Sequence, residues 1–274
     1  MTLSSGRTAL PGFSLTLGIT IVWLSLIVLL PLTVLALQPW TLGLAGVWHS
    51  VTEPRVLAAL RLSFGTAALA AAVNMPLGLL VAWVMVRYRF PLRNLADSLI
   101  DMPLALPTAV AGIALTALFA PRGWIGALLL PIGIRVAYTP IGIFVALVFV
   151  GLPFMVRTLE PVIMELPREA EEAAATLGAT RRQTLLRVVL PALTPALLAG
   201  FGAAFGRGIG EYGSVIFIAG NMPMVSEIAP LLILIRLEQL DYAGAAALAL
   251  VMLLASFAVL LMLNLLRGRL RSRA

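Results

Sequence analysis

The chain has 274 residues, of which 61% are hydrophobic and 11% are charged, and its mean hydropathy is +1.05. Soluble domains are about 45 to 50% apolar, so this composition excludes an ordinary soluble protein and indicates an integral membrane protein. The net charge is +7, all nineteen basic residues are arginine, and the chain has no cysteine. It therefore cannot form disulfides or Cys-ligated metal sites, and it lacks the lysine of a nucleotide-binding Walker A loop.

Six apolar stretches reach the length of about 20 residues that crosses a bilayer as a helix. They cover residues 13–37, 63–86, 99–120, 139–158, 190–220 and 243–266. The first exceeds the 7 to 15 apolar residues typical of a signal peptide, so we expect it to be retained. The sequence predicts an all-α membrane protein with six transmembrane helices, forming one domain over residues 1–274.

The distribution of arginine predicts the orientation, because basic residues stay preferentially on the cytoplasmic side. With the N-terminus inside, five arginines lie outside, thirteen lie in the cytoplasm, and Arg207 falls within a span. The outer five are Arg55, Arg61, Arg122, Arg135 and Arg236. The cytoplasmic thirteen are Arg7, Arg87, Arg89, Arg93, Arg157, Arg168, Arg181, Arg182, Arg187, Arg267, Arg269, Arg271 and Arg273. We therefore expect both termini, and the loop of residues 161–189, in the cytoplasm.

Prolines occur in or beside most of these spans, where each removes a backbone donor and tends to kink its helix. They are Pro76, Pro103, Pro107, Pro153, Pro191 and Pro195. The simplest interpretation is irregular helix packing.

The cytoplasmic loop is expected to form two short helices. Pro167 suits a first helical position, and the acids that follow it favour the positive end of a helix dipole. Gly178 can end this helix in the left-handed conformation. Thr180 and Gln183 have the capping-box spacing that starts the second helix.

The first of these helices has a face of small apolar residues. At helical spacing this face contains Leu166, Ala170, Ala173, Ala174 and Leu177. On the other side, Arg168 can pair with Glu171 and Glu172 three and four residues on. The helix either docks on another protein or lies on lipid headgroups. Its acidic, alanine-rich composition favours docking, because interfacial helices carry bulky apolar residues and basic charge.

Charged residues also occur in the fifth span, where Arg207 and Glu211 are four residues apart. A charge at membrane depth normally faces a partner or an aqueous cavity. The two residues are either a structural ion pair or, with Tyr212 and Ser214, part of a path in which Arg207 guides an anion. The surrounding G-x-G-x-x-G pattern lacks the βαβ context of a dinucleotide site. His49 is the single histidine, so no metal site is expected.

The loop resembles the EAA motif of ABC importer permeases, in which Glu-Ala-Ala is followed by a spaced glycine and an Ile-x-Leu-Pro ending. The matching residues are Glu172, Ala173, Ala174, Gly178, Val188 in place of isoleucine, Leu190 and Pro191. Residues 104–116, 151–162 and 210–233 resemble the T subunit of the sulfate/thiosulfate branch of these permeases. The likeness covers residues 100–245.

This resemblance implies a type I ABC importer permease fold, with residues 63–266 as a core unit of five helices. It implies that the loop of residues 161–189 carries a coupling helix that contacts a separate ATPase. The coupling residues would be Glu171, Glu172, Ala173, Ala174, Leu177 and Gly178.

The implied partners are two cytoplasmic ATPase subunits that bind ATP-Mg, a second permease subunit forming a heterodimer, and a periplasmic sulfate/thiosulfate-binding protein. The permease itself, in the bacterial inner membrane among its lipids, would hold no cofactor, bind no nucleic acid and catalyse no reaction. The alternatives are a molybdate/tungstate permease and a secondary anion transporter. The latter would need a coupling-ion site, and ionisable residues in the spans are few, chiefly Asp101 and Arg157 beyond the pair above.

Overall fold

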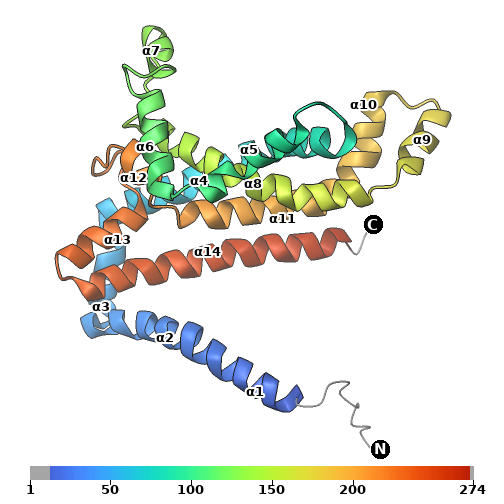
Figure 1. Cartoon of the computed structure of the whole chain (residues 1–274). Helices are drawn as coiled ribbons and strands as arrows, with labels where there is room; N and C mark the ends of the chain where they lie inside the picture. Colours follow the sequence, from blue (N-terminus) through green and yellow to red (C-terminus); the bar gives the residue numbers. More distant parts are fainter. Residues whose placement is uncertain (1–12, 272–274) are drawn as a thin grey trace, which may run out of the picture.

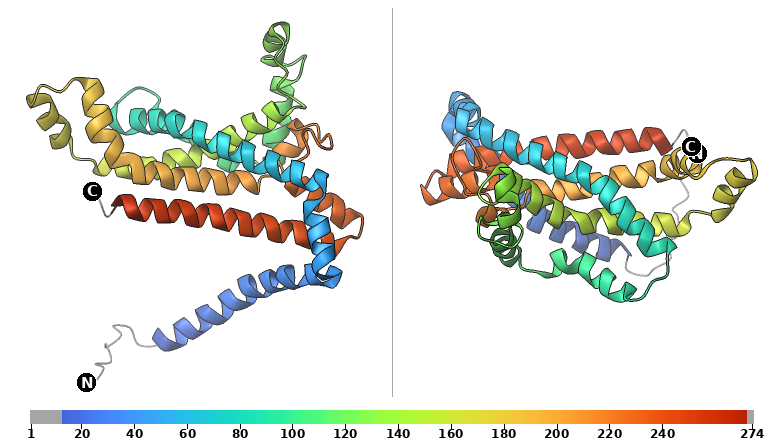
Figure 2. Two further views of the ribbon diagram at one scale, coloured as in Figure 1. Left: turned by 180° about the vertical axis from the view of Figure 1, so that it is seen from behind. Right: turned by 90° about the horizontal axis from the view of Figure 1, so that it is seen from above.

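The computed structural model describes residues 13–271, and this part of the chain is helical and contains no strand. Four helices run side by side along one axis: α4 (Pro54–Arg87), α8 (Pro140–Glu165), α11 (Leu190–Ile209) and α14 (Tyr242–Arg271) (Figures 1 and 2). Five helices are long and apolar enough to cross a membrane, and a bent pair would make a sixth. The predicted all-α membrane fold is confirmed.

The N-terminal apolar segment diverges from the other helices toward its free end (Figure 1). It comprises α1 (Phe13–Leu24), a π-helical turn (Ser25–Leu29), α2 (Leu30–Leu37), a 3-10 turn (Gln38–Leu42) and α3 (Gly43–Thr52). The apolar helix runs over Leu15–Thr52, well beyond the expected end at residue 37, and its most apolar window has no buried residue. Its contacts with α14 come chiefly from α2, α3 and the 3-10 turn, and α3 also contacts α4.

The expected span over residues 99–120 is present as an apolar region, but it is sharply bent. This region forms α5 (Arg93–Ala105) and α6 (Thr108–Phe119), whose axes meet at 109°. The break falls at Leu106, which has extended backbone angles because the ring of Pro107 disfavours the α conformation in the preceding residue. Beyond α6 the chain continues through α7 (Gly126–Leu129) and a 3-10 turn (Leu130–Ile132).

The expected span over residues 190–220 ends earlier than predicted, at Ile209. One continuous helix runs over Arg181–Ile209, through α10 (Arg181–Thr184), a π-helical turn (Leu185–Val189) and α11. It stops at Gly210, and α12 (Val215–Ile218) and α13 (Ala229–Glu238) follow as separate short helices. Glycines at 206, 208 and 210 weaken the helix there, because glycine is a poor helix former. Gly208 packs beside Ala67, so α11 ends near the middle of α4.

Glycines allow α4, α8 and α11 to approach one another closely. Met155 of α8 is fully buried between Gly78 of α4 and Gly200 of α11. A methyl group added to Gly78 would lie 2.4 Å from Met155 Cγ, and one added to Gly200 would lie 2.4 Å from its Sδ. Small residues at such contacts are typical of helix packing in membranes.

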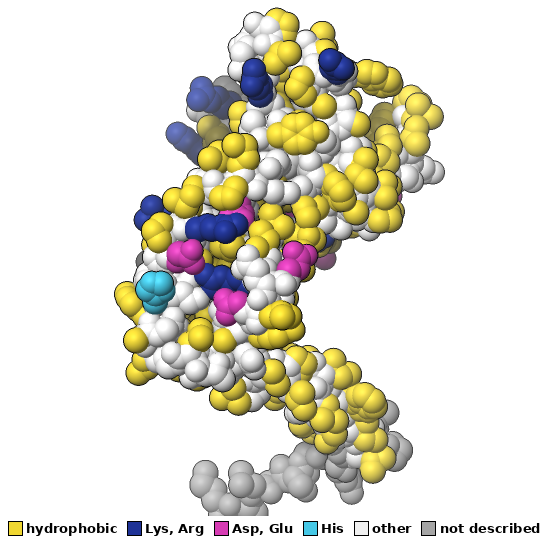
Figure 3. All heavy atoms as spheres, turned by 90° about the vertical axis from the view of Figure 1, so that its left-hand side faces the viewer, with side chains coloured by type: hydrophobic (Ala, Val, Ile, Leu, Met, Phe, Trp, Pro, Cys, Tyr) yellow, Lys and Arg dark blue, Asp and Glu magenta, His cyan; other side chains and the backbone are white. Residues whose placement is uncertain are grey.

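Ion pairs fasten the end of the bundle where α4 begins. Arg55 of α4 pairs with Glu227 at 2.6 Å, and Arg236 of α13 pairs with Glu53 at 2.8 Å. Figure 3 shows this end of the molecule, where acidic and basic side chains alternate and the single histidine, His49, lies at the edge. The pairs join α4 to two segments that follow α11.

The contact between Gly78 and Met155 predicts that two glycine substitutions in α4 will change the free energy of unfolding in opposite directions. Gly78→Ala should lower the free energy of unfolding by about 1–3 kcal/mol, since overpacking displaces Met155. Gly65→Ala should raise it by roughly 0.5–1 kcal/mol, because Gly65 has open space around it and alanine favours the helix. Thermal unfolding of the full chain in detergent measures both. Equal shifts, or a more stable Gly78→Ala variant, would contradict the close contact.

Candidate functional site

The loop after α8 forms the predicted pair of helices, at the end of the bundle where α14 finishes (Figure 1). Its first helix is α9 (Arg168–Thr176), preceded by Pro167 in extended conformation. Gly178 follows with φ of +79°, the left-handed geometry predicted for it. Thr180 and Gln183 form the predicted capping box, in which each side chain accepts a hydrogen bond from the other residue's backbone N–H.

The small face of α9 is only partly available to a partner. Ala170 and Ala174 are half-buried on the side toward the bundle, whereas Glu172, Ala173 and Leu177 are exposed. Leu177 is 88% exposed, a large fraction for a leucine next to the end of a helix. An isolated leucine of this kind needs no explanation, but here it follows directly after α9 and precedes Gly178, which is also exposed.

The ion pairs expected within α9 are not formed. Among the described residues Arg168 pairs with neither Glu171 nor Glu172, and Glu171 binds Arg87 of α4 at 2.8 Å instead. Glu171 is half-buried on the bundle side of α9, so its carboxylate reaches the end of α4. The spacing within α9 predicted Arg168 as the partner of Glu171. Such an i, i+3 pair contributes only about 0.2–0.5 kcal/mol, so it does not prevent Glu171 from binding Arg87.

The second candidate region lies where α11 ends. Arg207 Nη1 contacts Glu211 Oε2 at 2.6 Å, so the predicted pair is confirmed. Glu211 lies just beyond the helix, and its Oε1 accepts hydrogen bonds from Ser214 N at 2.9 Å and from Ser214 Oγ at 2.8 Å. The carboxylate is 1% exposed and Ser214 is fully buried. Glu211 therefore holds the turn from α11 to α12 as well as the guanidinium.

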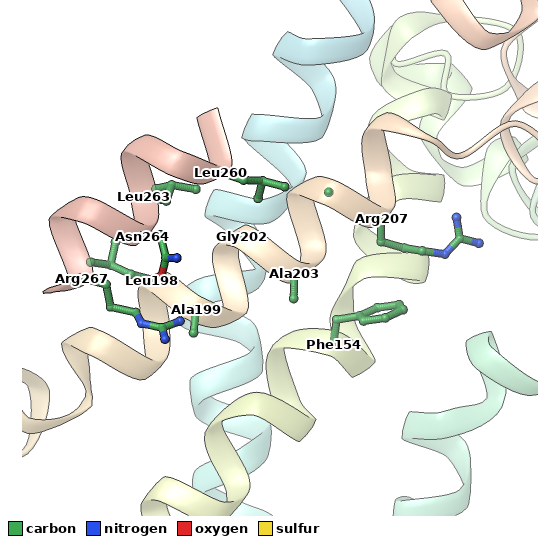
Figure 4. A pocket seen from close by; sticks show the side chains of 11 residues that line it. Phe154, Leu198, Ala199, Gly202, Ala203, Arg207, Leu260, Leu263, Asn264 and Arg267 are labelled. Carbon is green, nitrogen blue, oxygen red and sulfur yellow. The ribbon is translucent and has the colours of Figure 1, made fainter. Parts of the chain in front are cut away.

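Of the four candidate path residues, Arg207 lines a wide groove, whereas Glu211 lines a small cavity in the interior. Tyr212 is half-buried against the hydrophobic core, while Glu211 and Ser214 are buried. The side chain of Arg207 is 32% exposed and lies at one end of a groove of about 600 Å³ between α11 and α14. Asn264 and Arg267 of α14 lie at the other end (Figure 4). Small residues of α11 form the floor, chiefly Ala199, Gly202, Ala203 and Gly206.

Another charged cluster joins α5 to α8. Arg157 contacts Asp101 at 2.6 Å, Glu160 at 2.7 Å and Asp97 at 2.9 Å. Asp101 and Arg157 were noticed in the sequence as ionisable residues near the membrane, but their pairing was not predicted. The signal that was available is the i, i+4 spacing of Asp97 and Asp101, which places both acids on one face of α5.

Two features of this chain therefore occur together: a protruding capped helix after α8, and a long helix that leads from it to a buried charge pair. The sequence profile of the binding-protein-dependent transport system inner membrane components matches residues 74–272. The chain belongs to this family. It is a multi-pass component of the inner membrane, as its apolar helices also indicate.

Curated relatives of this permease include sulfate transport system permease proteins CysT. The Salmonella typhimurium protein is 48% identical over 265 residues, covering 97% of this chain and 96% of the relative. The Synechocystis protein is 47% identical over 249 residues, covering 91% and 87%. The resemblance to the sulfate permease T subunit is thus confirmed.

Solved structures with the same fold are ABC importers. A bacterial alginate ABC transporter in complex with its alginate-bound periplasmic protein matches with a TM-score of 0.76, 18% identity and 93% coverage of both chains. The MetNI methionine ABC transporter matches with a TM-score of 0.51 and 17% identity, covering 85% of this chain and 96% of that one. Both identities are low, so these matches establish the fold alone.

The contacts of Glu211 predict that two substitutions will lower the thermal stability of the permease by unequal amounts. Glu211→Ala leaves the partly exposed Arg207 guanidinium and the buried Ser214 without their acceptor, and removing the partner of a buried polar group costs about 1–3 kcal/mol. The double substitution Arg207→Gln and Glu211→Gln removes both charges and keeps an acceptor for Ser214, so its unfolding temperature should stay close to that of the parent. Thermal unfolding in detergent compares them. A double variant as unstable as Glu211→Ala would show that loss of the ion pair itself, and not the unpaired guanidinium, causes the loss of stability.

Proposed function

We propose that this chain is one permease subunit of an ATP-driven importer that moves sulfate and thiosulfate into the cytoplasm by alternating access. The observation that carries the proposal is its identity of 47–48% with sulfate permeases over nearly the full chain. The fold it shares with ABC importer permeases supports the same reading. ATP-Mg would bind to the partner ATPases, since this chain has no lysine for a Walker A loop.

In this proposal α9 is the coupling helix, and its exposed turn inserts into a cleft on the ATPase. Glu172, Ala173, Leu177 and Gly178 would form the contact, while Ala174 and Glu171 would face the bundle. The exposure of Leu177 and the two well-defined caps support a rigid projection rather than a disordered loop. Two such ATPases, a second homologous permease and a periplasmic sulfate-binding protein would complete the importer.

The proposed topology places α9 and both termini in the cytoplasm. Arginines 87, 89, 93, 168, 181, 182, 187, 267 and 269 belong to the end of the bundle that carries α9 and the end of α14, which supports this orientation under the positive-inside rule. Arg7 and Arg273, which also supported it in the sequence, lie outside the described residues. Arg55 and Arg236 lie at the opposite end.

The translocation path would pass Arg207. Its Nη1 is engaged by Glu211. The rest of its partly exposed guanidinium extends on the side of Phe154, away from α14 (Figure 4), where it can donate hydrogen bonds to an anion. The paired carboxylate compensates its charge, so a passing dianion would be attracted without being trapped. Glu211 and Ser214 would position the guanidinium from behind, and Tyr212 would pack beside them.

Anion uptake tests the substrate. In proteoliposomes that hold the full complex and ATP, labelled sulfate should accumulate when binding protein is present outside, and thiosulfate should compete with it. Molybdate should compete at least tenfold more weakly, a difference of about 1.4 kcal/mol in binding. Stronger competition by molybdate would favour the molybdate/tungstate alternative. Uptake that persists without ATP would favour a secondary transporter.

The neutral double variant Arg207→Gln/Glu211→Gln distinguishes a role of Arg207 in guiding the anion from a purely structural role of the pair. Because it keeps the hydrogen bonds of Ser214, it should assemble normally while sulfate uptake falls by about tenfold, which corresponds to roughly 1.4 kcal/mol of lost anion stabilisation. Arg207→Lys, which keeps the positive charge, should retain more uptake. Uptake equal to the parent in the neutral variant would restrict the pair to a structural role.

A further inference from the structure

The end of α4 contacts α9 through a single ion pair across an otherwise open space. A cavity of about 490 Å³ separates α9 and α10 from the end of α4, and Trp83, Tyr88 and Glu171 are among the residues that line it. Arg87 reaches from α4 to Glu171 at one side of this cavity, with 2.8 Å between Nη2 and Oε1. Apolar packing therefore contributes little to the contact between α9 and α4.

Arg87 is held firmly on its own helix. Its side chain is 11% exposed, and its guanidinium carbon lies 5.1 Å from the centre of the Trp83 ring, a cation–π distance. Nη2 also donates to the carbonyl oxygen of Leu166, the residue that ends α8. The guanidinium thus touches α4, the end of α8 and α9 at once. A partly buried, charge-assisted contact of this kind is stronger than an exposed surface pair.

We infer that Arg87 is a positioning residue that couples α4 to α9, so that movement of α9 is transmitted to α4. This inference rests on the proposed function, in which α9 moves with the ATPase. Without the pair, α9 would pull only on the helices joined to it by the chain, which are α8 and α10. With it, α4 moves too, and α4 packs along both α8 and α11.

The guanidinium has spare donor capacity for such movement. Its Nε–H is buried and has no hydrogen-bond partner, and a buried unpaired donor is unfavourable. A small shift of α9 toward α4 would let the Glu171 carboxylate bind Nε and Nη2 together, the side-on geometry typical of Arg–carboxylate pairs. The pair can therefore persist in two positions of α9.

The test measures the number of ATP molecules hydrolysed per sulfate transported by the reconstituted complex. Arg87→Gln and Glu171→Gln should each raise this ratio by roughly fivefold, the lower end of coupling effects between sites. Arg89→Gln and Glu169→Gln, which remove the same charges from exposed positions nearby, should leave it unchanged. The charge exchange Arg87→Glu/Glu171→Arg should restore coupling at least in part. No rise in Arg87→Gln, or an equal rise in Arg89→Gln, would overturn the inference.

A covalent link between positions 87 and 171 provides a second test, in which one variant is compared before and after bridging. The chain has no cysteine, so Arg87→Cys/Glu171→Cys can be bridged selectively with a short bis-methanethiosulfonate. Bridging should return the ATP-to-sulfate ratio toward that of the parent, and a monofunctional reagent should not. An unchanged ratio after bridging would contradict the coupling role. Failure of the parent complex to take up sulfate would instead overturn the proposed function.

Discussion

Charge compensation inside an apolar bundle is the constraint on which the rest of this structure depends. Isolated charges at membrane depth are costly, and five of the arginines on or beside the bundle helices are paired with an acid. The pairs are Arg55–Glu227, Arg87–Glu171, Arg157–Asp101, Arg207–Glu211 and Arg236–Glu53. Four of these pairs join segments that are distant in the sequence, and they determine where those segments are fixed to one another. The fifth, Arg207–Glu211, holds the turn at the end of α11.

Between these fixed points the helices pack through small residues. Gly78 and Gly200 admit Met155, and Gly151 lies against Asn74, so α4, α8 and α11 approach closely. Contacts of this kind depend on shape and not on direction, and they permit small displacements of one helix along another. With ion pairs at their ends and small residues between, the helices could shift slightly along one another while staying connected.

Local signals predicted local structure well. The stop at Gly178 and the capping box at Thr180 are short-range features with a defined geometry, and both are present. Hydropathy located the apolar segments, but it could not detect the break at Leu106 or the end of α11 at Ile209. Apolar residues continue on both sides of Leu106, where the break comes from Pro107, and α11 ends at clustered glycines between Arg207 and Glu211. Partners distant in sequence, such as Arg87 for Glu171, follow from the tertiary fold and have no local signal.

The loop after α8 and the Arg207–Glu211 pair lie at opposite ends of one continuous helix. The helix over Arg181–Ile209 begins at the capping box beside α9 and ends at Arg207, a length of about 43 Å at 1.5 Å per residue. A π-helical turn over Leu185–Val189 and an internal proline, Pro195, interrupt its regular hydrogen bonding. A stiff helix transmits displacement along its axis. If α9 moves as proposed, this helix would transmit the motion toward the Arg207–Glu211 pair, and Arg87 would transmit it to the neighbouring α4.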